Sequence, residues 1–180
     1  MTMQFELADY LNPVFVETGT FHGNGVRAAL RAGFKKIISL EVFAPMVQAN
    51  EERFSEHIRN GTVAIVHGDS GEALEAVLHS IGDNPITFWL DAHIQTQNGG
   101  GVGTEKCPVV AELRQIARAR AAQFEDVILI DDLRLIEDAN AGWAVNIGDM
   151  YRTLWDINRR FAISRLDGHV PHDVLCCRPA

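Results

Sequence analysis

The fold class of this chain is decided by the stretch Val14-Phe-Val-Glu-Thr-Gly-Thr-Phe-His-Gly-Asn-Gly25. Its apolar start predicts a buried strand over 14–17, because a strand that is covered on both faces is apolar at consecutive positions. An amphipathic stretch over 25–32 follows the glycines and predicts a helix. Glycine allows a sharp turn between the two elements and lets the backbone approach a ligand at the electropositive helix N-terminus. The stretch therefore predicts a strand, a ligand-binding loop and a helix.

The same unit recurs along the chain of 180 residues. Short apolar runs predict further strands over 36–41, 63–66, 86–91 and 127–131. Amphipathic stretches between them predict helices over 45–59, 70–80 and 109–122. On the last of these, Arg114, Arg118 and Arg120 predict a solvated helix face. Strands that alternate with helices predict an α/β fold with a doubly wound, Rossmann-like sheet that is mostly parallel, because right-handed crossovers place helices on both faces.

The C-terminal tail departs from this alternation. The segments 161–166 and 173–178 flank the turn residues Asp167-Gly168 and predict an antiparallel, hairpin-like pair. We therefore expect the sheet to end in an antiparallel C-terminal strand. We also expect a single domain over residues 1–180, because chains of this length usually fold as one unit.

The composition limits the partners and the location of the protein. The chain carries 16 Lys and Arg against 24 Asp and Glu, a formal net charge of −8. Nucleic acids and anionic membranes are not expected partners, because binding them requires a basic surface. The three cysteines are too few for a disulfide scaffold. With no visible secretory leader and no membrane-spanning apolar run, we expect a soluble, cytoplasmic protein.

Acidic residues follow each of the predicted parallel strands. They are Glu17, Glu41, Asp69, Asp91 and the pair Asp131-Asp132. Because the carboxyl ends of parallel strands share one edge, these acids would gather where open α/β sheets bind ligands. Clustered carboxylates repel one another, so ribose hydroxyls, an amine or sulfonium, or a metal ion are candidate partners. The alternative is that each acid caps the following helix, which is strongest for Asp69 because Glu72 completes a capping box.

The glycine loop distinguishes between nucleotide-binding motifs. Gly19, Gly23 and Gly25 do not match G-x-G-x-x-G, and the glycines over 99–103 lack the Gly-Lys-Ser/Thr ending of a P-loop. Glu41 lies 24 residues after Glu17, near the offset of about 20 at which an acid on the second strand holds a ribose. The combination indicates an adenosine-type ligand and disfavours an NAD-dependent dehydrogenase.

The chain resembles the class I S-adenosylmethionine (SAM)-dependent methyltransferases over nearly its whole length, from about residue 14 to 178. Glu17-Thr-Gly-Thr-x-x-Gly23 resembles the first motif of that family, Glu41 stands at its ribose position, and Gly68-Asp69-Ser70 stands at its adenine edge. An antiparallel final strand is also typical of the family. The resemblance implies SAM as the cofactor, with these residues in its site: Glu17, Thr18, Gly19, Thr20, Phe21, Gly23, Glu41, Val42, Gly68, Asp69, Ser70 and Asp91.

Two further motifs resemble the cation-dependent O-methyltransferases within this family. They are Phe88-Trp-Leu-Asp91-Ala-His93 and Ile128-Leu-Ile-Asp131-Asp132. The resemblance implies that Asp91, Asp131 and Asp132 hold Mg²⁺ and that His93 is the general base, which makes Asp91 and His93 the catalytic candidates. This chain departs from the catechol-type enzymes in carrying Asp132 where they have an amide. Neighbours in a strand face opposite ways, so both acids can reach one metal only if the chain turns there.

These inferences predict SAM-dependent O-methylation of a small-molecule hydroxyl, assisted by a divalent metal. The glycine-rich segment 94–104 would act as a lid that orders when ligands bind. Two alternatives stay open: a non-catalytic binding protein with the SAM fold, and a metal-dependent enzyme of related fold, such as a hydroxylase. The sequence does not fix the oligomeric state, but in a homo-oligomer a partner subunit could wall the pocket.

Overall fold

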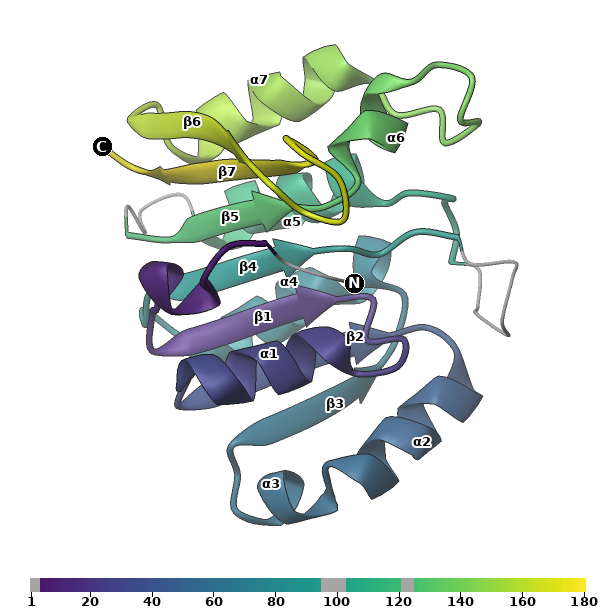
Figure 1. Ribbon diagram of the computed structural model, residues 1–180, viewed down its shortest axis with the longest axis vertical. Coiled ribbons are helices and arrows are strands. Elements are labelled where there is room, and N and C mark those ends of the chain that lie inside the picture. The colour runs from purple at the N-terminus through teal and green to yellow at the C-terminus, as the bar shows by residue number, and fades with distance from the viewer. Residues whose placement is uncertain (1–3, 95–102, 121–124) are drawn as a thin grey trace.

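The computed structural model describes residues 4–94, 103–120 and 125–180, which form a seven-stranded sheet flanked by helices (Figure 1). The strands are β1 (Val14–Thr18), β2 (Lys36–Glu41), β3 (Val63–His67), β4 (Ile86–Leu90), β5 (Val127–Ile130), β6 (Phe161–Leu166) and β7 (Val174–Pro179). The helices are η1 (Leu7–Tyr10, a 3-10 helix), α1 (Asn24–Ala32), α2 (Ala44–Arg53), α3 (Ser55–Arg59), α4 (Ser70–Ile81), α5 (Val109–Arg120), α6 (Leu133–Glu137) and α7 (Ile147–Ile157). Among these described residues, no helix is both long enough and apolar enough to cross a membrane.

The sheet has the strand order β3-β2-β1-β4-β5-β7-β6. The strands β1 to β5 run parallel, and β7 lies antiparallel between β5 and β6. The doubly wound α/β fold with an antiparallel C-terminal strand is therefore confirmed. The strand order reverses between β1 and β4, so the carboxyl ends of these two strands form the switch point at which such sheets bind ligands.

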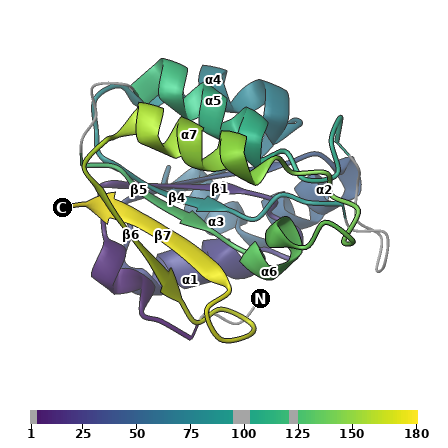
Figure 2. The same cartoon turned by 90° about the horizontal axis from the view of Figure 1, so that it is seen from above.

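Helices cover both faces of the sheet (Figure 2). The helices α4, α5 and α7 lie on one face, and α1 lies on the other. Successive strand residues point to opposite faces, so Val14 and Val16 enter one hydrophobic core while Phe15 enters the other. The free thiols Cys176 and Cys177 are divided between the two cores in the same way. Burial on both faces explains why the strands are apolar at consecutive positions.

The prediction of one helix over 45–59 is wrong, because the structure divides this segment into α2 and α3. Phe54 stands between them with φ −104° and ψ 18°. Its side chain is buried in the core on the α1 face. A Cβ at Gly23 would lie 2.6 Å from the Phe54 ring, so the break places this ring directly beneath the glycine loop.

The connection between β6 and β7 is longer than the predicted turn at Asp167-Gly168. The two strands pair antiparallel, but residues 167–173 join them. Asp167 Oδ1 accepts the N–H of His172 over 2.9 Å, and His172 adopts a left-handed backbone with φ +61°. The extra residues place Asp173 directly before β7, beside the carboxyl end of β5.

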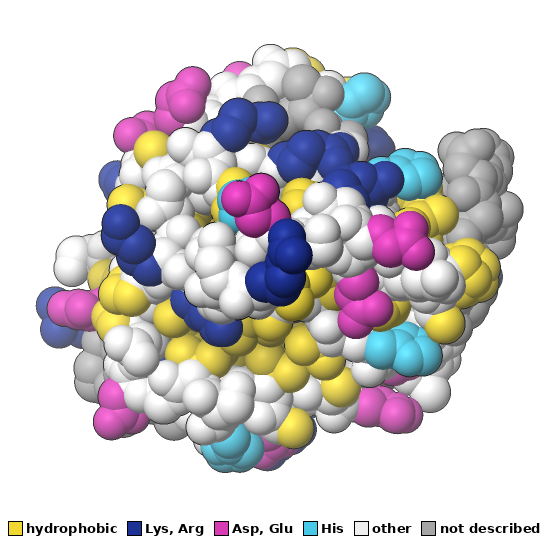
Figure 3. All heavy atoms as spheres, turned by 90° about the horizontal axis from the view of Figure 1, so that it is seen from below, with side chains coloured by type: hydrophobic (Ala, Val, Ile, Leu, Met, Phe, Trp, Pro, Cys, Tyr) yellow, Lys and Arg dark blue, Asp and Glu magenta, His cyan; other side chains and the backbone are white. Residues whose placement is uncertain are grey.

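The sheet is partly open at its β3 edge. On the face that carries α4, Ala64 and Val66 of β3 and Ala73 and Val77 of α4 are only partly buried. Figure 3 views the molecule from the lower end of Figure 1, toward the β3 edge, and shows hydrophobic side chains gathered in one patch with Lys and Arg side chains beside it. The covering helices therefore protect the centre of the sheet more completely than this edge.

Candidate active site

A cavity of about 540 Å³ opens at the switch point of the sheet, a size that is common for ligand pockets. Residues that follow β1, β2, β3, β4 and β5 form its wall. The wall contains most of the residues predicted for the site: Glu17, Gly19, Thr20, Phe21, Glu41, Val42, Gly68, Asp69, Ser70, Asp91, His93, Asp131 and Asp132. The structure places two others outside the wall, because Thr18 is buried within β1 and Gly23 faces Phe54.

The loop between β1 and α1 requires glycine at two positions. Gly19 has φ +81°, and a Cβ there would lie 2.7 Å from the carbonyl oxygen of Asp91. A Cβ at Gly25 would lie 1.6 Å from Glu17 Oε1. The loop therefore packs against the end of β4 as bare backbone, and the start of α1 covers the Glu17 carboxyl group.

Glu17 lies at the end of β1 with only 1% of its surface exposed. Ser39 Oγ donates a hydrogen bond of 2.5 Å to Glu17 Oε2, and Thr20 Oγ1 lies 2.6 Å from Ser39 Oγ. Burial raises the pKa of Glu17 to about 8, because it disfavours the charged form of the carboxyl group. The hydrogen bond from Ser39 lowers the pKa by less than burial raises it, and the negative charges of Asp91 and Glu41 raise it further. A cationic ligand group beside Glu17 would favour its ionised form.

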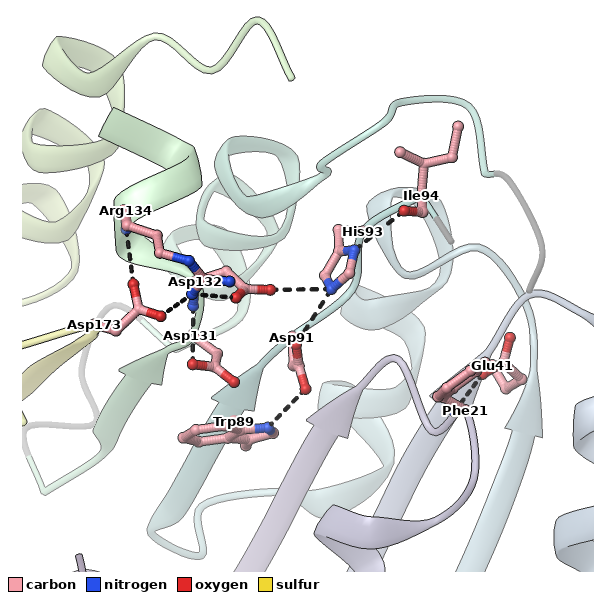
Figure 4. A network of polar contacts seen from close by, with 10 residues as sticks. All are labelled: Phe21, Glu41, Trp89, Asp91, His93, Ile94, Asp131, Asp132, Arg134 and Asp173. Carbon is pink, nitrogen blue, oxygen red and sulfur yellow. Dashed lines mark hydrogen bonds and ion pairs between the residues drawn. The ribbon is translucent and has the colours of Figure 1, made fainter. Parts of the chain in front are cut away.

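Glu41, at the end of β2, holds the glycine loop in place. Its Oε2 accepts the N–H of Phe21 over 2.7 Å (Figure 4). Its Oε1 accepts the N–H of Phe43 over 2.9 Å. Phe21 adopts a left-handed backbone with φ 44°, which is strained for a residue with a large side chain. Glu41 therefore stabilises the strained turn and lines the cavity where a ribose is expected.

Helix capping accounts for some of the acids at this edge but not for all. Asp69 is the N-cap residue of α4, and its Oδ1 accepts the N–H of Gly71 over 2.9 Å. Asp132 also stands at an N-cap position, that of α6, but its side chain makes no capping hydrogen bond. The capping interpretation is therefore confirmed for Asp69 and is wrong for Asp132.

His93 lies between two acids at the end of the cavity away from the glycine loop (Figure 4). Its Nε2 is 3.1 Å from Asp132 Oδ2 and 3.7 Å from Asp91 Oδ1, and its Nδ1 is 3.2 Å from the carbonyl oxygen of Ile94. Burial lowers the pKa of His93, but the hydrogen bond to Asp132 and the charges of both acids outweigh burial and raise it. The ring is therefore held with Nε2 toward the carboxylates.

The chain turns sharply between Asp131 and Asp132. Asp132 has φ +55°, and Asp131 Oδ1 accepts its N–H over 2.9 Å. Arg134 Nη1 lies 2.8 Å from Asp132 Oδ1 and also pairs with Asp173 (Figure 4). The turn directs Asp132 to His93 while Asp131 stays in the cavity wall.

Two clusters of described residues bring possible metal-ligand atoms within 4.8 Å of one another: Asp91, His93 and Asp132, and Asp131, Asp132 and Asp173. The three acids predicted as ligands are thus divided between two clusters that share Asp132. In the second cluster, Arg134 already supplies a positive charge. In the first, burial raises the pKa of Asp91 well above its usual range, and the charge of Asp131 adds to it. A divalent cation would relieve this repulsion, so the first cluster fits a metal better.

Several solved structures resemble this chain. The O-methyltransferase TomG from Streptomyces achromogenes, in complex with SAM, matches with a TM-score of 0.64 and 14% sequence identity. The match covers 97% of this chain and 76% of the TomG chain. A methyltransferase from Podospora anserina with bound S-adenosylhomocysteine (SAH) has a TM-score of 0.62 and 16% identity, covering 97% and 74%. An rRNA methylase from Streptococcus thermophilus has a TM-score of 0.55 and 12% identity, covering 96% and 91%. No protein-family model and no curated protein matches the chain.

The chain has a methyltransferase fold. At identities of 12–16% the likeness establishes the fold alone. The neighbours include an O-methyltransferase involved in tomaymycin synthesis and an rRNA methylase, so the acceptor has to be inferred from the chemistry of the site.

Several residues of the site were not predicted from the sequence, and three of them lie beside His93 and Asp132. Arg134 and Asp173 pair beside Asp132, and Trp143 stacks on His93 with ring centroids 4.9 Å apart and an interplanar angle of 23°. Asp173 carries no local signal, because it reaches the site only through the pairing of β7 with β5. Most of the predicted lid, residues 95–102, lies outside the described part of the chain.

Glu17 is expected to make the protein less stable as the pH rises. Its pKa of about 8 in the folded state exceeds its ordinary value of 4.5. Its contribution to stability is therefore fully present below about pH 4.5 and is lost as the pH rises through about 8. Between about pH 5 and about pH 8, ionisation of Glu17 should lower the free energy of unfolding by on the order of 1 kcal/mol or more. Glu17→Gln cannot ionise and should therefore lack this decrease.

Urea unfolding at several pH values measures the effect, with the exposed Glu72→Gln as the matched control. Both substitutions remove one carboxylate from the chain, but only the Glu17 side chain is buried. The same pH dependence in Glu17→Gln and in the wild type would contradict the raised pKa.

Proposed function

We propose that this chain is a SAM-dependent methyltransferase that methylates a hydroxyl group of a small molecule. The observation that carries the proposal is the arrangement of the cavity. The glycine loop and Glu41 lie at one end, and His93 lies between two acids at the other. The first end suits an adenosine, and the second suits removal of a proton from an acceptor.

The end with the glycine loop would bind the nucleoside and amino-acid parts of SAM. Each carboxylate oxygen of Glu41 accepts one backbone N–H and retains a lone pair for a ribose hydroxyl. The backbone of Gly19 and Thr20 allows close approach, and the Glu17 carboxyl group is a partner for the cationic amino group of SAM. Residues 68–70 line the cavity where the adenine would lie.

His93 is the proposed general base. When Nδ1–H donates to the Ile94 carbonyl oxygen, Nε2 is the ring nitrogen that can take a proton. Asp132 and Asp91, at 3.1 and 3.7 Å from Nε2, would stabilise the imidazolium that forms. Bound SAM would supply a sulfonium methyl group for transfer to the acceptor oxygen, with SAH as the leaving group. The acceptor proton passes to Nε2, and the cavity wall contributes by holding the reacting groups close together.

Assistance by Mg²⁺ is part of the proposal. Asp91 and Asp132 would hold the ion, with Asp131 beside them, because hard oxygen ligands suit Mg²⁺. The bound ion would lower the pKa of the acceptor hydroxyl. His93 Nε2 lies among the same carboxylate oxygens, so it either takes the proton or becomes a ligand, and the experiments below separate these roles.

A small molecule is the proposed acceptor, in preference to a nucleic acid. The net charge of −8 disfavours a polyphosphate chain, and Asp91, Asp131 and Asp132 add negative charge at the acceptor end of the cavity. A cytoplasmic location, and a homo-oligomer in which a second copy walls the cavity, stay predictions from the sequence.

Thermal unfolding with ligands tests the proposed cofactor. SAM or SAH at about 100 times its Kd should stabilise the protein by about 2.7 kcal/mol, because both bind the folded state. For a chain of this size, that gain corresponds to an increase in Tm of about 5–10 °C. NAD is the control ligand. An increase with NAD and none with SAM or SAH would overturn the proposal.

Adding Mg²⁺ to the SAH complex tests the metal in the same assay. We expect a further increase in Tm, which Asp131→Asn should reduce while the increase with SAH remains. The matched control is Asp138→Asn, because Asp138 is an exposed acid near the same turn. If Asp131→Asn leaves the Mg²⁺ response unchanged, Asp131 does not contribute to a metal site.

A further inference from the structure

We propose that Asp69 is a positioning residue that fixes one wall of the cofactor cavity through Thr104, and that it does not read the adenine base. The proposal rests on the SAM site proposed above, in which Asp69 stands at the adenine edge. A ligand role and a positioning role make different demands on the carboxylate. A residue that binds the adenine needs free hydrogen-bond acceptor positions toward the cavity. In a positioning residue, hydrogen bonds from other groups of the protein occupy these positions.

The protein itself occupies both carboxylate oxygens of Asp69. Oδ2 accepts two hydrogen bonds from Thr104, one from the backbone N–H over 2.5 Å and one from the Oγ1 hydroxyl over 2.6 Å. Oδ1 accepts the N–H of Gly71 over 2.9 Å. Three of the roughly four acceptor positions of a carboxylate are therefore in use. Binding the adenine amino group through Oδ2 would displace a contact with Thr104.

The two segments approach closely at a glycine on each side, and at Gly103 there is no room for a side chain. A Cβ at Gly103 would lie 2.6 Å from Asp69 Oδ2 and 2.9 Å from Asp69 Cγ, so a side chain there would displace the carboxylate. A Cβ at Gly71 would lie 3.3 Å from Pro108 Cβ. The segment 103–108 and the start of α4 therefore meet closely at two places, and the Asp69 side chain joins them.

The segment that Asp69 holds forms part of the cavity wall. Gly103, Glu105 and Pro108 line the cavity together with Asp69. The Ile94 N–H donates to the Lys106 carbonyl oxygen over 2.6 Å, which ties the same segment to the chain after β4. Residues 103–108 are thus anchored at the ends of both β3 and β4, and loss of either anchor would alter the cavity.

Matched substitutions test the positioning role. Asp69→Asn keeps a side-chain oxygen for the cap on Gly71, but its amide group cannot accept both bonds from Thr104. Thr104→Val removes only the hydroxyl, and Thr104→Ser is the control that keeps it. We expect the Kd of SAH to rise about 10-fold in Asp69→Asn and about 3-fold or more in Thr104→Val, because each loses hydrogen bonding to a charged group.

The double variant distinguishes one shared interaction from two separate ones. Asp69→Asn combined with Thr104→Val should bind SAH about as weakly as Asp69→Asn alone, since both changes remove the same contact. Fold-changes that multiply in the double variant would overturn the proposal. So would an unchanged Kd in Thr104→Val.

S-inosylhomocysteine tests the adenine role directly, because a carbonyl oxygen replaces the N6 amino group of SAH in this compound. The ratio of its Kd to the Kd of SAH should be the same in the wild type and in Asp69→Asn. If the ratio falls toward one in the variant, Asp69 reads the adenine amino group, and the proposal is overturned.

Hydrogen exchange in the free protein separates this proposal from the proposed function. Amides over 104–107 should exchange faster in Asp69→Asn and Thr104→Val than in the wild type and Thr104→Ser, because the segment has lost an anchor. If the wild type binds no SAH while exchange changes in this way, the SAM site is wrong and the anchoring contact is supported. Unchanged exchange in both variants would overturn the proposal, whatever the ligand binding.

Discussion

Replacing Asp126 by asparagine should lower the free energy of unfolding by about 3–5 kcal/mol, because the guanidinium group of Arg120 is left buried without a counter-charge. Arg120 is 2% exposed and Asp126 is 0% exposed. For a chain of this size, the loss corresponds to a fall in Tm of roughly 10 °C. Thermal and urea unfolding of the variant measure both quantities.

The pair of Arg120 and Asp126 joins three segments at the edge of the sheet opposite the cavity. The Nε and Nη2 atoms of Arg120 lie 2.9 and 2.8 Å from the two carboxylate oxygens of Asp126. Arg120 Nη2 also donates to the carbonyl oxygen of Asn84 over 2.7 Å, and Asp126 Oδ1 accepts the N–H of Ile86 over 2.8 Å. The pair thereby connects the end of α5 with the starts of β4 and β5.

An exposed ion pair between the same helix, α5, and the neighbouring helix α4 supplies the control. Arg118 Nη2 lies 2.7 Å from Glu75 Oε2, but water screens this pair, so Glu75→Gln should leave unfolding almost unchanged. Arg120→Met combined with Asp126→Leu should destabilise less than Asp126→Asn, because it removes both charges together. If Asp126→Asn and Glu75→Gln changed the free energy of unfolding by equally small amounts, the buried pair would not contribute to stability as proposed.

This helix also shows where prediction from the sequence ends. The interpretation of Arg114, Arg118 and Arg120 as a solvated face holds for the first two, which are exposed, and is wrong for Arg120. Helical periodicity places a side chain on a face of its own helix, but it carries no information about Asp126 or the carbonyl groups that surround Arg120. These partners lie beyond the helix and come together only when the sheet forms.

The fold and the acidic edge of the sheet could be predicted because they depend on local patterns. Apolar runs fix the strands, and an acid at the end of each run must lie at the shared carboxyl edge. The contacts of Asp132 could not be predicted in this way. They depend on the left-handed backbone of Asp132 itself, on Asp173, which directly precedes β7, and on His93, against which Trp143 stacks. The last two are relations between segments distant in the sequence.

His93→Gln should reduce kcat by about 100- to 10,000-fold, which is the usual contribution of a general base. Glutamine can still donate a hydrogen bond to Asp132, but it has no nitrogen that takes a proton near neutral pH. The Kd of SAH should stay nearly constant, because His93 lies at the acceptor end of the cavity. Methyl transfer to an accepted hydroxyl substrate and SAH binding by calorimetry measure the two quantities.

The effect of His93→Gln on kcat, compared with its effect on the Kd of SAH, identifies the role of His93. His79→Gln, an exposed histidine on α4, is the matched control and should change neither quantity. A parallel loss of SAH affinity and kcat in His93→Gln would mean that the ring supports the cavity through its contacts with Asp132 and Trp143. Loss of the Mg²⁺ response with SAH binding intact would instead make Nε2 a metal ligand, since one nitrogen lone pair cannot hold a metal and a proton together. An unchanged kcat would assign the base to another group of the acidic cluster.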